Sequence, residues 1–279
     1  MWGPGAEPLA FLGVVSSPAA SRYAQGMTDT ELLALAADLA LQAATLIMDI
    51  RARGFETLSK ADDTPVTEAD RQAEALILRG LRAACPEIPV IAEEEIAAGH
   101  VVHHSAQYWL VDPLDGTREF AAGREDFTVN VGLVRDGRAV LGAVALPAYG
   151  EVFGGVVGQG AWKRVGGVQQ PIAARKPPEA GLDVLASRHY ADDPRLAEFL
   201  AGQKMASLRN LGSAVKFVRL AEGVADLYPR LGRTMEWDTA APQAVLEAAG
   251  GHVRVLPGGE PLRYGKPGWE NPHFLCTGA

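Results

Sequence analysis

Two aspartates stand close together in the run Asp112-Pro113-Leu114-Asp115-Gly116-Thr117, directly after an apolar stretch that ends at Val111. Because the apolar stretch predicts a strand, both carboxylates and a backbone carbonyl emerge where that strand ends, and such oxygens suit a hard cation. Gly116 permits close approach of the backbone, and a helix beginning near Thr117 would present free N–H groups to an anion such as phosphate. Taken alone, the run is explained equally well by an ordinary strand-end turn with aspartate caps.

Two further acidic groups stand where elements of the chain are predicted to begin or end. Glu93-Glu94-Glu95 follows the short apolar run Val90 to Ala92, and Asp238 precedes a predicted helix from about Thr239 to Ala249. A solvated acidic turn explains the glutamates, and helix N-capping, worth about 1 kcal/mol, explains Asp238. Each group alone therefore indicates no chemistry.

The charge and cysteine content limit the classes of partner. The chain has 279 residues, 48% of them hydrophobic, and a formal net charge of −8, which gives no electrostatic footprint for nucleic acid. An anionic substrate must therefore be met by local cations. Only Cys85 and Cys276 could form a disulfide, and a chain of this length needs none, which favours a reducing cytoplasm.

The order of apolar patterns predicts helices first and a sheet after them. One helix should follow the capping box of Thr28 to Glu31 and run from Leu32 to Arg51. A second should run from Glu68 to Ala84, with Thr67 and Asp70 as its capping pair and Pro86 just past its end, and a polar loop over 60–67 should lie between the two helices. Tight turns separate the next runs, so we expect a largely antiparallel sheet. Its strands are expected at Val90–Ala92, Tyr108–Val111, Phe127–Val134, Ala139–Leu146 and Glu151–Val157.

The same pattern divides the chain. Residues 1–27 are expected to be a disordered extension, residues 28–176 an N-terminal lobe, and residues 182–279 a C-terminal lobe. A Pro/Gly-rich stretch, 175–181, separates the lobes. No basic region precedes the first apolar run, and no apolar stretch is expected to approach the ~20 residues of a membrane-spanning helix.

Taken together, the acidic groups resemble a known pattern. The chain reads Glu93-Glu94, then Trp109-Leu-Val-Asp-Pro-Leu-Asp-Gly-Thr117, then Trp237-Asp238, similar to the E-E, W-x-[VI]-D-P-x-D-G-T and W-D pattern of the inositol monophosphatase-like superfamily of metal-dependent, lithium-sensitive phosphatases. This resemblance implies an α+β fold: a layered αβαβα sandwich of two lobes with the active site between them. It also implies that the N-terminal lobe, 28–176, binds the metal and that the C-terminal lobe, 182–279, completes the substrate site.

Within that superfamily the chain most resembles the 3'(2'),5'-bisphosphate nucleotidases of the CysQ type, through the blocks KADDTPVTEAD, EDFTVNVGLV and LGSAVKFVRLAEGVADLYPRLG. The resemblance implies hydrolysis of the 3'-phosphate of 3'-phosphoadenosine 5'-phosphate, or its 5'-phosphosulfate, in sulfur assimilation. It also implies a cytoplasmic enzyme, or one held peripherally on the cytoplasmic face of the inner membrane. The chain departs from this family at Ser187-Arg188-His189-Tyr190, where relatives read S-R-S-H, so His189 would alter the base or sugar contacts.

The resemblance also implies a site with two or three Mg2+ ions. Glu93, Asp112 and the Leu114 carbonyl would bind one ion, and Asp112, Asp115 and Asp238 a second. Glu93 and Thr117 would serve catalysis, Thr117 by orienting the attacking water, and either Asp62 or Asp63 would assist that water. The substrate would be contacted by Leu114, Asp115, Gly116, Thr117, His189, Ser213, Lys216, Arg230 and Asp238.

Two alternatives to a nucleotide phosphatase remain open. The metal site does not itself encode the alcohol, so an inositol phosphate or sugar phosphate could be the substrate. A protein without catalytic activity could use the same carboxylates to sense divalent ions or to bind phosphorylated ligands. The residues themselves give no indication of oligomeric state.

Overall fold

The computed structural model describes residues 26–59, 65–101 and 105–279. The expected extension over 1–27 therefore lies almost wholly outside the described residues, and so do Asp62 and Asp63.

Two helices form the first layer, α1 (Asp29–Arg53) and α2 (Glu68–Ala84). Each begins at a threonine in a capping box: the Thr28 N–H donates to Glu31 Oε2 at 2.8 Å, and the Thr67 N–H donates to Asp70 Oδ2 at 2.7 Å. These reciprocal bonds satisfy amide groups that a helix start leaves without a partner. The predicted bounds of α2 are confirmed, and α1 extends beyond the predicted Leu32 to Arg51 by three residues at its start and two at its end.

Helix α1 is also long and apolar enough, by length and composition alone, to cross a membrane. The expectation that no such stretch occurs is therefore wrong. Half of its most apolar window is buried inside the protein, where leucine, isoleucine and alanine side chains of one face join the core beneath the sheet. A buried core helix of this composition satisfies the same criterion.

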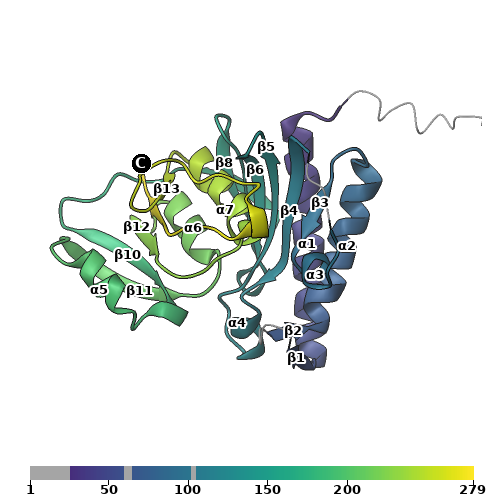
Figure 1. Cartoon of the computed structure of the whole chain (residues 1–279), viewed down its shortest axis with the longest axis horizontal. Helices are drawn as coiled ribbons and strands as arrows, with labels where there is room; N and C mark the ends of the chain where they lie inside the picture. Colours follow the sequence, from purple (N-terminus) through teal and green to yellow (C-terminus); the bar gives the residue numbers. More distant parts are fainter. Residues whose placement is uncertain (1–25, 60–64, 102–104) are drawn as a thin grey trace, which may run out of the picture.

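The second layer is a seven-stranded sheet in the order β3-β4-β5-β6-β7-β8-β9 (Figure 1). Only β3 and β4 are parallel, so the prediction of a largely antiparallel sheet is confirmed. The strands are β3 (Val90–Ala92), β4 (Gln107–Asp115), β5 (Thr128–Arg135), β6 (Arg138–Leu146), β7 (Glu151–Val156), β8 (Gly160–Val165) and β9 (Val168–Ile172). A separate pair, β1 (Thr57–Ser59) and β2 (Pro65–Thr67), lies partly where a loop was expected.

Helices α6 (Val215–Ala221) and α7 (Glu236–Ala248) form the third layer, between the large sheet and a five-stranded sheet (Figure 1). The smaller sheet has the order β11-β10-β12-β14-β13, and α5 (Pro194–Leu200) packs on its outer face. The expected αβαβα sandwich is thus confirmed. The strands are β10 (Leu182–Ser187), β11 (Met205–Leu211), β12 (Leu227–Arg230), β13 (His252–Val255) and β14 (Phe274–Thr277).

A row of glycines sets the distance between the large sheet and α7. Gly142 on β6 pairs in register with Gly132 on β5 and with Gly155 on β7. A Cβ atom on Gly132 would lie 2.6 Å from the Ala241 N atom, and one on Gly155 would lie 2.7 Å from the Ala248 Cβ. Because no side chain fits there, the α7 backbone lies directly against the middle of the sheet.

The predicted lobe boundary, between residues 176 and 182, falls in the segment that connects the two sheets. The hydrophobic core does not divide at that point. One buried cluster joins Tyr108 and Phe153 of the large sheet to Val245 of α7 and Phe274 of the small sheet. The division into lobes therefore stays a prediction, and the packing favours the two halves folding together.

We expect Gly142→Ala to lower the free energy of unfolding by about 2 kcal/mol, since its new methyl group would press on the Ala241 backbone of α7. Urea unfolding of the mutant and the wild type measures this. Gly26→Ala is the control, because nothing lies within 4 Å of its added Cβ. Equal stability of Gly142→Ala and wild type would contradict close helix-to-sheet contact.

Candidate active site

A pocket of about 550 Å3 opens where β4, α4 (Thr117–Ala121), α6 and α7 approach one another. Every candidate site residue that lies in the described ranges lines it, although these residues come from both halves of the chain. The residues are Glu93, Asp112, Leu114, Asp115, Gly116, Thr117, His189, Ser213, Lys216, Arg230 and Asp238.

The end of β4 delivers two of the acidic side chains. Pairing with β5 shifts register between Asp112 and Asp115, so the chain leaves the regular ladder between the two carboxylates. Gly116 follows with φ of 96°, and a Cβ there would lie 3.0 Å from the Asp126 carbonyl oxygen and 3.2 Å from the Ser213 Cβ. A larger residue would strain the backbone and push the two halves apart, so this position requires glycine.

Glu93 and Asp238 occupy helix positions that differ from those expected. Glu93 is the first residue of the short helix α3 (Glu93–Ala97) rather than part of a solvated turn. Asp238 was expected to precede its helix, but α7 begins at Glu236, and Asp238 lies in the first turn. Its Oδ2 atom accepts the Met235 N–H at 2.8 Å, because a carboxylate three residues into a helix reaches back to the residue before it.

Burial and mutual repulsion disfavour the ionised forms of the carboxyl groups in the pocket. Burial, followed by the nearby carboxylates of Glu93, Asp115 and Asp238, raises the pKa of Asp112 well above its ordinary value. Burial also raises the pKa of Asp238 to about 8, with further contributions from Asp115 and Glu93. Carboxylates placed together in this way would be stabilised by a cation among them.

The donor set fits a hard cation such as Mg2+, since it consists of carboxylate and carbonyl oxygens. Asn130 pairs with Asp112 across the sheet, and both polar atoms of its buried side chain have no hydrogen-bond partner. In the described ranges, no three His, Cys, Asp or Glu side chains lie close enough together to form a preformed metal site. Instead, Asp112 accepts the Leu114 N–H at 3.0 Å and Asp115 accepts the Ala214 N–H at 2.6 Å.

Thr117 contacts an aspartate that the sequence assigned only to helix capping. The Thr117 hydroxyl lies 2.8 Å from Asp70 Oδ1 and 3.1 Å from the Leu114 carbonyl oxygen. Asp70 Oδ2 meanwhile accepts the Thr67 N–H and hydroxyl. The same carboxylate therefore caps α2 and fixes the orientation of Thr117. The T-x-A-D pattern of residues 67–70 was the signal available in the sequence.

A buried aspartate outside the predicted set joins the two halves of the pocket. Asp126 pairs with Arg188, accepts the Tyr149 hydroxyl at 3.0 Å and accepts the Gly212 N–H at 3.3 Å. This network holds the turn that presents Ser213, whose hydroxyl lies 2.8 Å from that of Thr128.

Lys216 lies at the floor of the pocket with 1% of its surface exposed. Its ammonium group donates to the Ser213 carbonyl at 2.5 Å and to the Leu211 carbonyl at 3.1 Å. Burial, and after it the nearby Arg230 cation, lowers the pKa of Lys216 to about 7. Its first role in this structure is therefore to hold the turn before α6.

The wall formed by the C-terminal half is basic and aromatic. His189 Nε2 lies 2.8 Å from Arg118 Nη1, which reaches it from α4 across the mouth of the pocket. Since the guanidinium is a donor, the imidazole nitrogen is the acceptor. Arg230 donates to the Arg233 carbonyl at 2.6 Å, and its guanidinium lies 5.0 Å from the centre of the Tyr190 ring.

An αβαβα sandwich with an oxygen-lined acidic pocket at a strand end is the arrangement of a metal-dependent phosphatase. The inositol monophosphatase family matches residues 28–273, and the chain belongs to this family, whose members generally use Mg2+.

Similarity to three other proteins supports this membership. The 3'(2'),5'-bisphosphate nucleotidase CysQ of Salmonella typhimurium is 42% identical over 244 residues, covering 86% of this chain and 96% of its own length. The 3'-phosphoadenosine 5'-phosphate phosphatase of Mycobacterium leprae is 37% identical, with 92% of each chain covered. The crystal structure of CysQ from Bacteroides thetaiotaomicron matches with a TM-score of 0.74 and 32% identity, covering 90% of this chain and 98% of its own.

We expect the buried Lys216 to make stability depend on pH. Its folded pKa of about 7 lies below the ordinary 10.5, so between these values the unfolded chain binds more protons and stability rises with pH. Relative to Lys216→Met, the wild type should gain about 1 kcal/mol per pH unit from pH 7.5 to 9.5. Urea unfolding of both proteins in EDTA measures the difference, and parallel profiles would contradict the lowered pKa of Lys216.

Proposed function

We propose that this chain is a Mg2+-dependent phosphatase that removes the 3'-phosphate of 3'-phosphoadenosine 5'-phosphate, giving AMP and phosphate. The observation that carries the reaction is that four carboxylates line one pocket together with Thr117, whose hydroxyl donates to Asp70. The names of the relatives, which match over almost their whole length, support the choice of a bisphosphate nucleotide and a role in sulfur assimilation. The 5'-phosphosulfate of the same nucleotide is a second substrate in this proposal.

Two Mg2+ ions are proposed, one held by Glu93, Asp112 and the Leu114 carbonyl, and one by Asp112, Asp115 and Asp238. Bound Mg2+ supplies Lewis-acid charge to the reacting phosphoryl group and its leaving oxygen. Asp112 and Asp115 each give one oxygen to a backbone N–H and keep the other for this purpose. Asp238 lies in the first turn of α7, and the positive end of the helix dipole favours the negative charge of its carboxylate.

Thr117 and Asp70 position the attacking water in this proposal. The Thr117 hydroxyl proton is directed toward Asp70 Oδ1 and the Leu114 carbonyl, so the oxygen lone pairs remain to accept a hydrogen bond from the attacking water and orient it. Asp70 cannot turn away, because its other oxygen caps α2. We therefore assign to Asp70 the supporting acidic role that the sequence had given to Asp62 or Asp63.

The phosphate that is not cleaved is proposed to meet the basic wall. Lys216 and Arg230 carry the nearest buried and half-buried charges, and Ser213 adds a hydroxyl on the same turn. Arg230 uses only two of its guanidinium donors on backbone carbonyls, so others remain for phosphate. His189 and Tyr190, at the mouth, are proposed to contact the base or sugar.

The enzyme is proposed to act in the cytoplasm. Both cysteines are buried and free, which agrees with a reducing compartment.

Thr117→Val should lower kcat by about 100-fold to 10,000-fold, since it removes the hydroxyl that orients the water and keeps a similar volume. Thr117→Ser retains the hydroxyl and should keep most of the activity. Steady-state rates with 3'-phosphoadenosine 5'-phosphate at saturating Mg2+ give the comparison. A valine variant that folds normally and turns over at the wild-type rate would remove Thr117 from the mechanism.

Substrate choice is tested by phosphate release from 3'-phosphoadenosine 5'-phosphate and from inositol 1-phosphate, each with Mg2+, with EDTA and with added Li+. We expect the nucleotide to have the higher kcat/KM by at least about tenfold, because only it offers a second phosphate to the basic wall. EDTA should abolish both activities and Li+ should inhibit them. Preference for inositol 1-phosphate would refute the proposed substrate but not the metal chemistry, and full activity in EDTA would refute both.

A further inference from the structure

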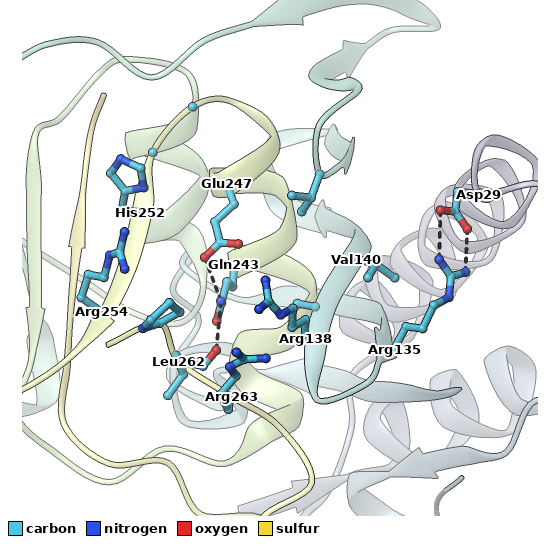
Figure 2. A pocket seen from close by; sticks show the side chains of 15 residues that line it. Asp29, Arg135, Arg138, Val140, Gln243, Glu247, His252, Arg254, Leu262 and Arg263 are labelled. Atoms are coloured by element: carbon cyan, nitrogen blue, oxygen red, sulfur yellow. Dashed lines mark hydrogen bonds and ion pairs between the residues drawn. The ribbon is translucent and has the colours of Figure 1, made fainter. Parts of the chain in front are cut away.

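A second cavity lies near the C-terminal end of α7, and it shares no lining residue with the active-site pocket. Its volume is about 540 Å3, close to the 550 Å3 of the active site. The ends of β5 and β13, the start of β6, the second half of α7 and the segment 261–263 form its walls (Figure 2). A cavity of this size accommodates a small organic ligand.

Three arginines from three different segments gather around this cavity. Figure 2 shows Arg138, Arg254 and Arg263 arranged around Gln243 and Glu247 of α7. No hydrogen bond or ion pair occupies their guanidinium groups in the part of the chain that the structure describes. Their donors are therefore free for a ligand.

Two other groups of cations outside the active-site pocket are neutralised by carboxylates. Arg175 pairs with both Asp183 and Asp226. Lys163 and Arg219 likewise share a pair of glutamates, Glu151 and Glu222. The three arginines around the cavity differ from these groups, because no carboxylate forms an ion pair with them in the described part of the chain.

Backbone hydrogen bonds fix the relative positions of the three arginines. The Tyr264 N–H donates to the Gly137 carbonyl at 3.1 Å and so joins the segment of Arg263 to the turn before Arg138. The Leu262 N–H donates to the Val253 carbonyl at 3.3 Å, beside Arg254. The Gln243 side chain also donates to the Leu262 carbonyl at 3.4 Å. Like charges are thus brought together by the fold.

The acidic side chains of the cavity do not cancel this charge. Asp29 makes two hydrogen bonds to Arg135, at 2.7 and 3.2 Å. Glu247 accepts the Gln243 amide at 2.9 Å, and burial raises its pKa although Arg254 and Arg138 oppose that shift. The arginine charges also interact favourably with the negative end of the α7 helix dipole. That interaction is weak and uses none of the guanidinium N–H donors. A local positive excess remains in a protein whose net charge is −8.

We propose that this cavity is a binding site for a small phosphate-bearing anion, with Arg138, Arg254 and Arg263 as its contacts. The planar guanidinium fork matches two phosphate oxygens at once, so three forks around one space suit a ligand with at least two phosphate groups. Inorganic pyrophosphate and a nucleoside diphosphate share this chemistry, and only the nucleotide would use the remaining volume. The site is independent of the proposed catalytic function.

The test is calorimetric titration of the full chain, in EDTA at low salt, with pyrophosphate and separately with ADP. Arg138→Gln/Arg263→Gln should weaken binding of either probe by about tenfold or more, since each lost charge-assisted contact contributes at least that factor. The matched control is Arg71→Gln/Arg79→Gln, which removes two exposed arginines of α2 and changes the net charge equally. The control should bind within about twofold of the wild type, and tighter binding of ADP than of pyrophosphate would identify the nucleotide as the ligand.

Three outcomes would overturn the proposal: undiminished binding by the double variant, an equal loss in the control, or binding of hexaglutamate by a protein that binds neither phosphate probe. Should the double variant fail to fold, Arg254→Gln provides the same comparison. Phosphatase activity of the variants, measured with Mg2+, should stay within about twofold of the wild type, because none of these arginines lines the active-site pocket. This result separates failure of the second site from failure of the proposed catalytic function.

Discussion

The contact between α7 and the glycine row of the large sheet determines the geometry of the active site. Glycines paired across three strands let the Ala241 backbone lie against the sheet, where any side chain would hold the helix away. The first turn of α7 carries Asp238, while β4 of the same sheet carries Asp112 and Asp115. The position of Asp238 relative to β4 therefore depends on the lack of side chains at the paired glycines of the sheet.

The carboxylates brought together in this way oppose one another. Two carboxylates about 4 Å apart repel by about 4 kcal/mol at an effective dielectric near 20, and burial raises the pKa of Asp112 further. The fold stabilises this arrangement with neutral donors: backbone N–H groups bond to Asp112, Asp115 and Asp238. A divalent cation would replace this partial compensation with full charges, so the proposed metal affinity follows from the electrostatic strain that the packing imposes.

The sequence predicted the parts of the fold that depend on local patterns. Capping residues marked both starts of the first layer, and the end of α2 was marked by Pro86. It did not predict β9, whose residues are almost all exposed and carry no alternation of apolar side chains. The position of Asp238 was misjudged because a carboxylate before a helix and one in its first turn look alike in sequence.

The functional roles that remained hidden depend on contacts between distant residues. Asp70 already had a complete local explanation as a cap, and only the fold brings its second oxygen to Thr117. The near-complete burial of Lys216 depends on the turn at Leu211 to Ser213, whose carbonyls surround its ammonium group. A lysine on a short amphipathic stretch gives no sign of such a turn.

The two walls of the active site resolve an apparent conflict in a negatively charged protein that must bind an anion. The N-terminal half supplies three of the four carboxylates, and the C-terminal half supplies the fourth together with Lys216 and Arg230. In the proposed binding mode, one phosphate of a bisphosphate substrate meets acidic groups that require a cation as intermediary, and the other meets the basic side chains of Lys216 and Arg230. Under this proposal only one orientation satisfies both walls, so the charge arrangement selects which phosphate is cleaved.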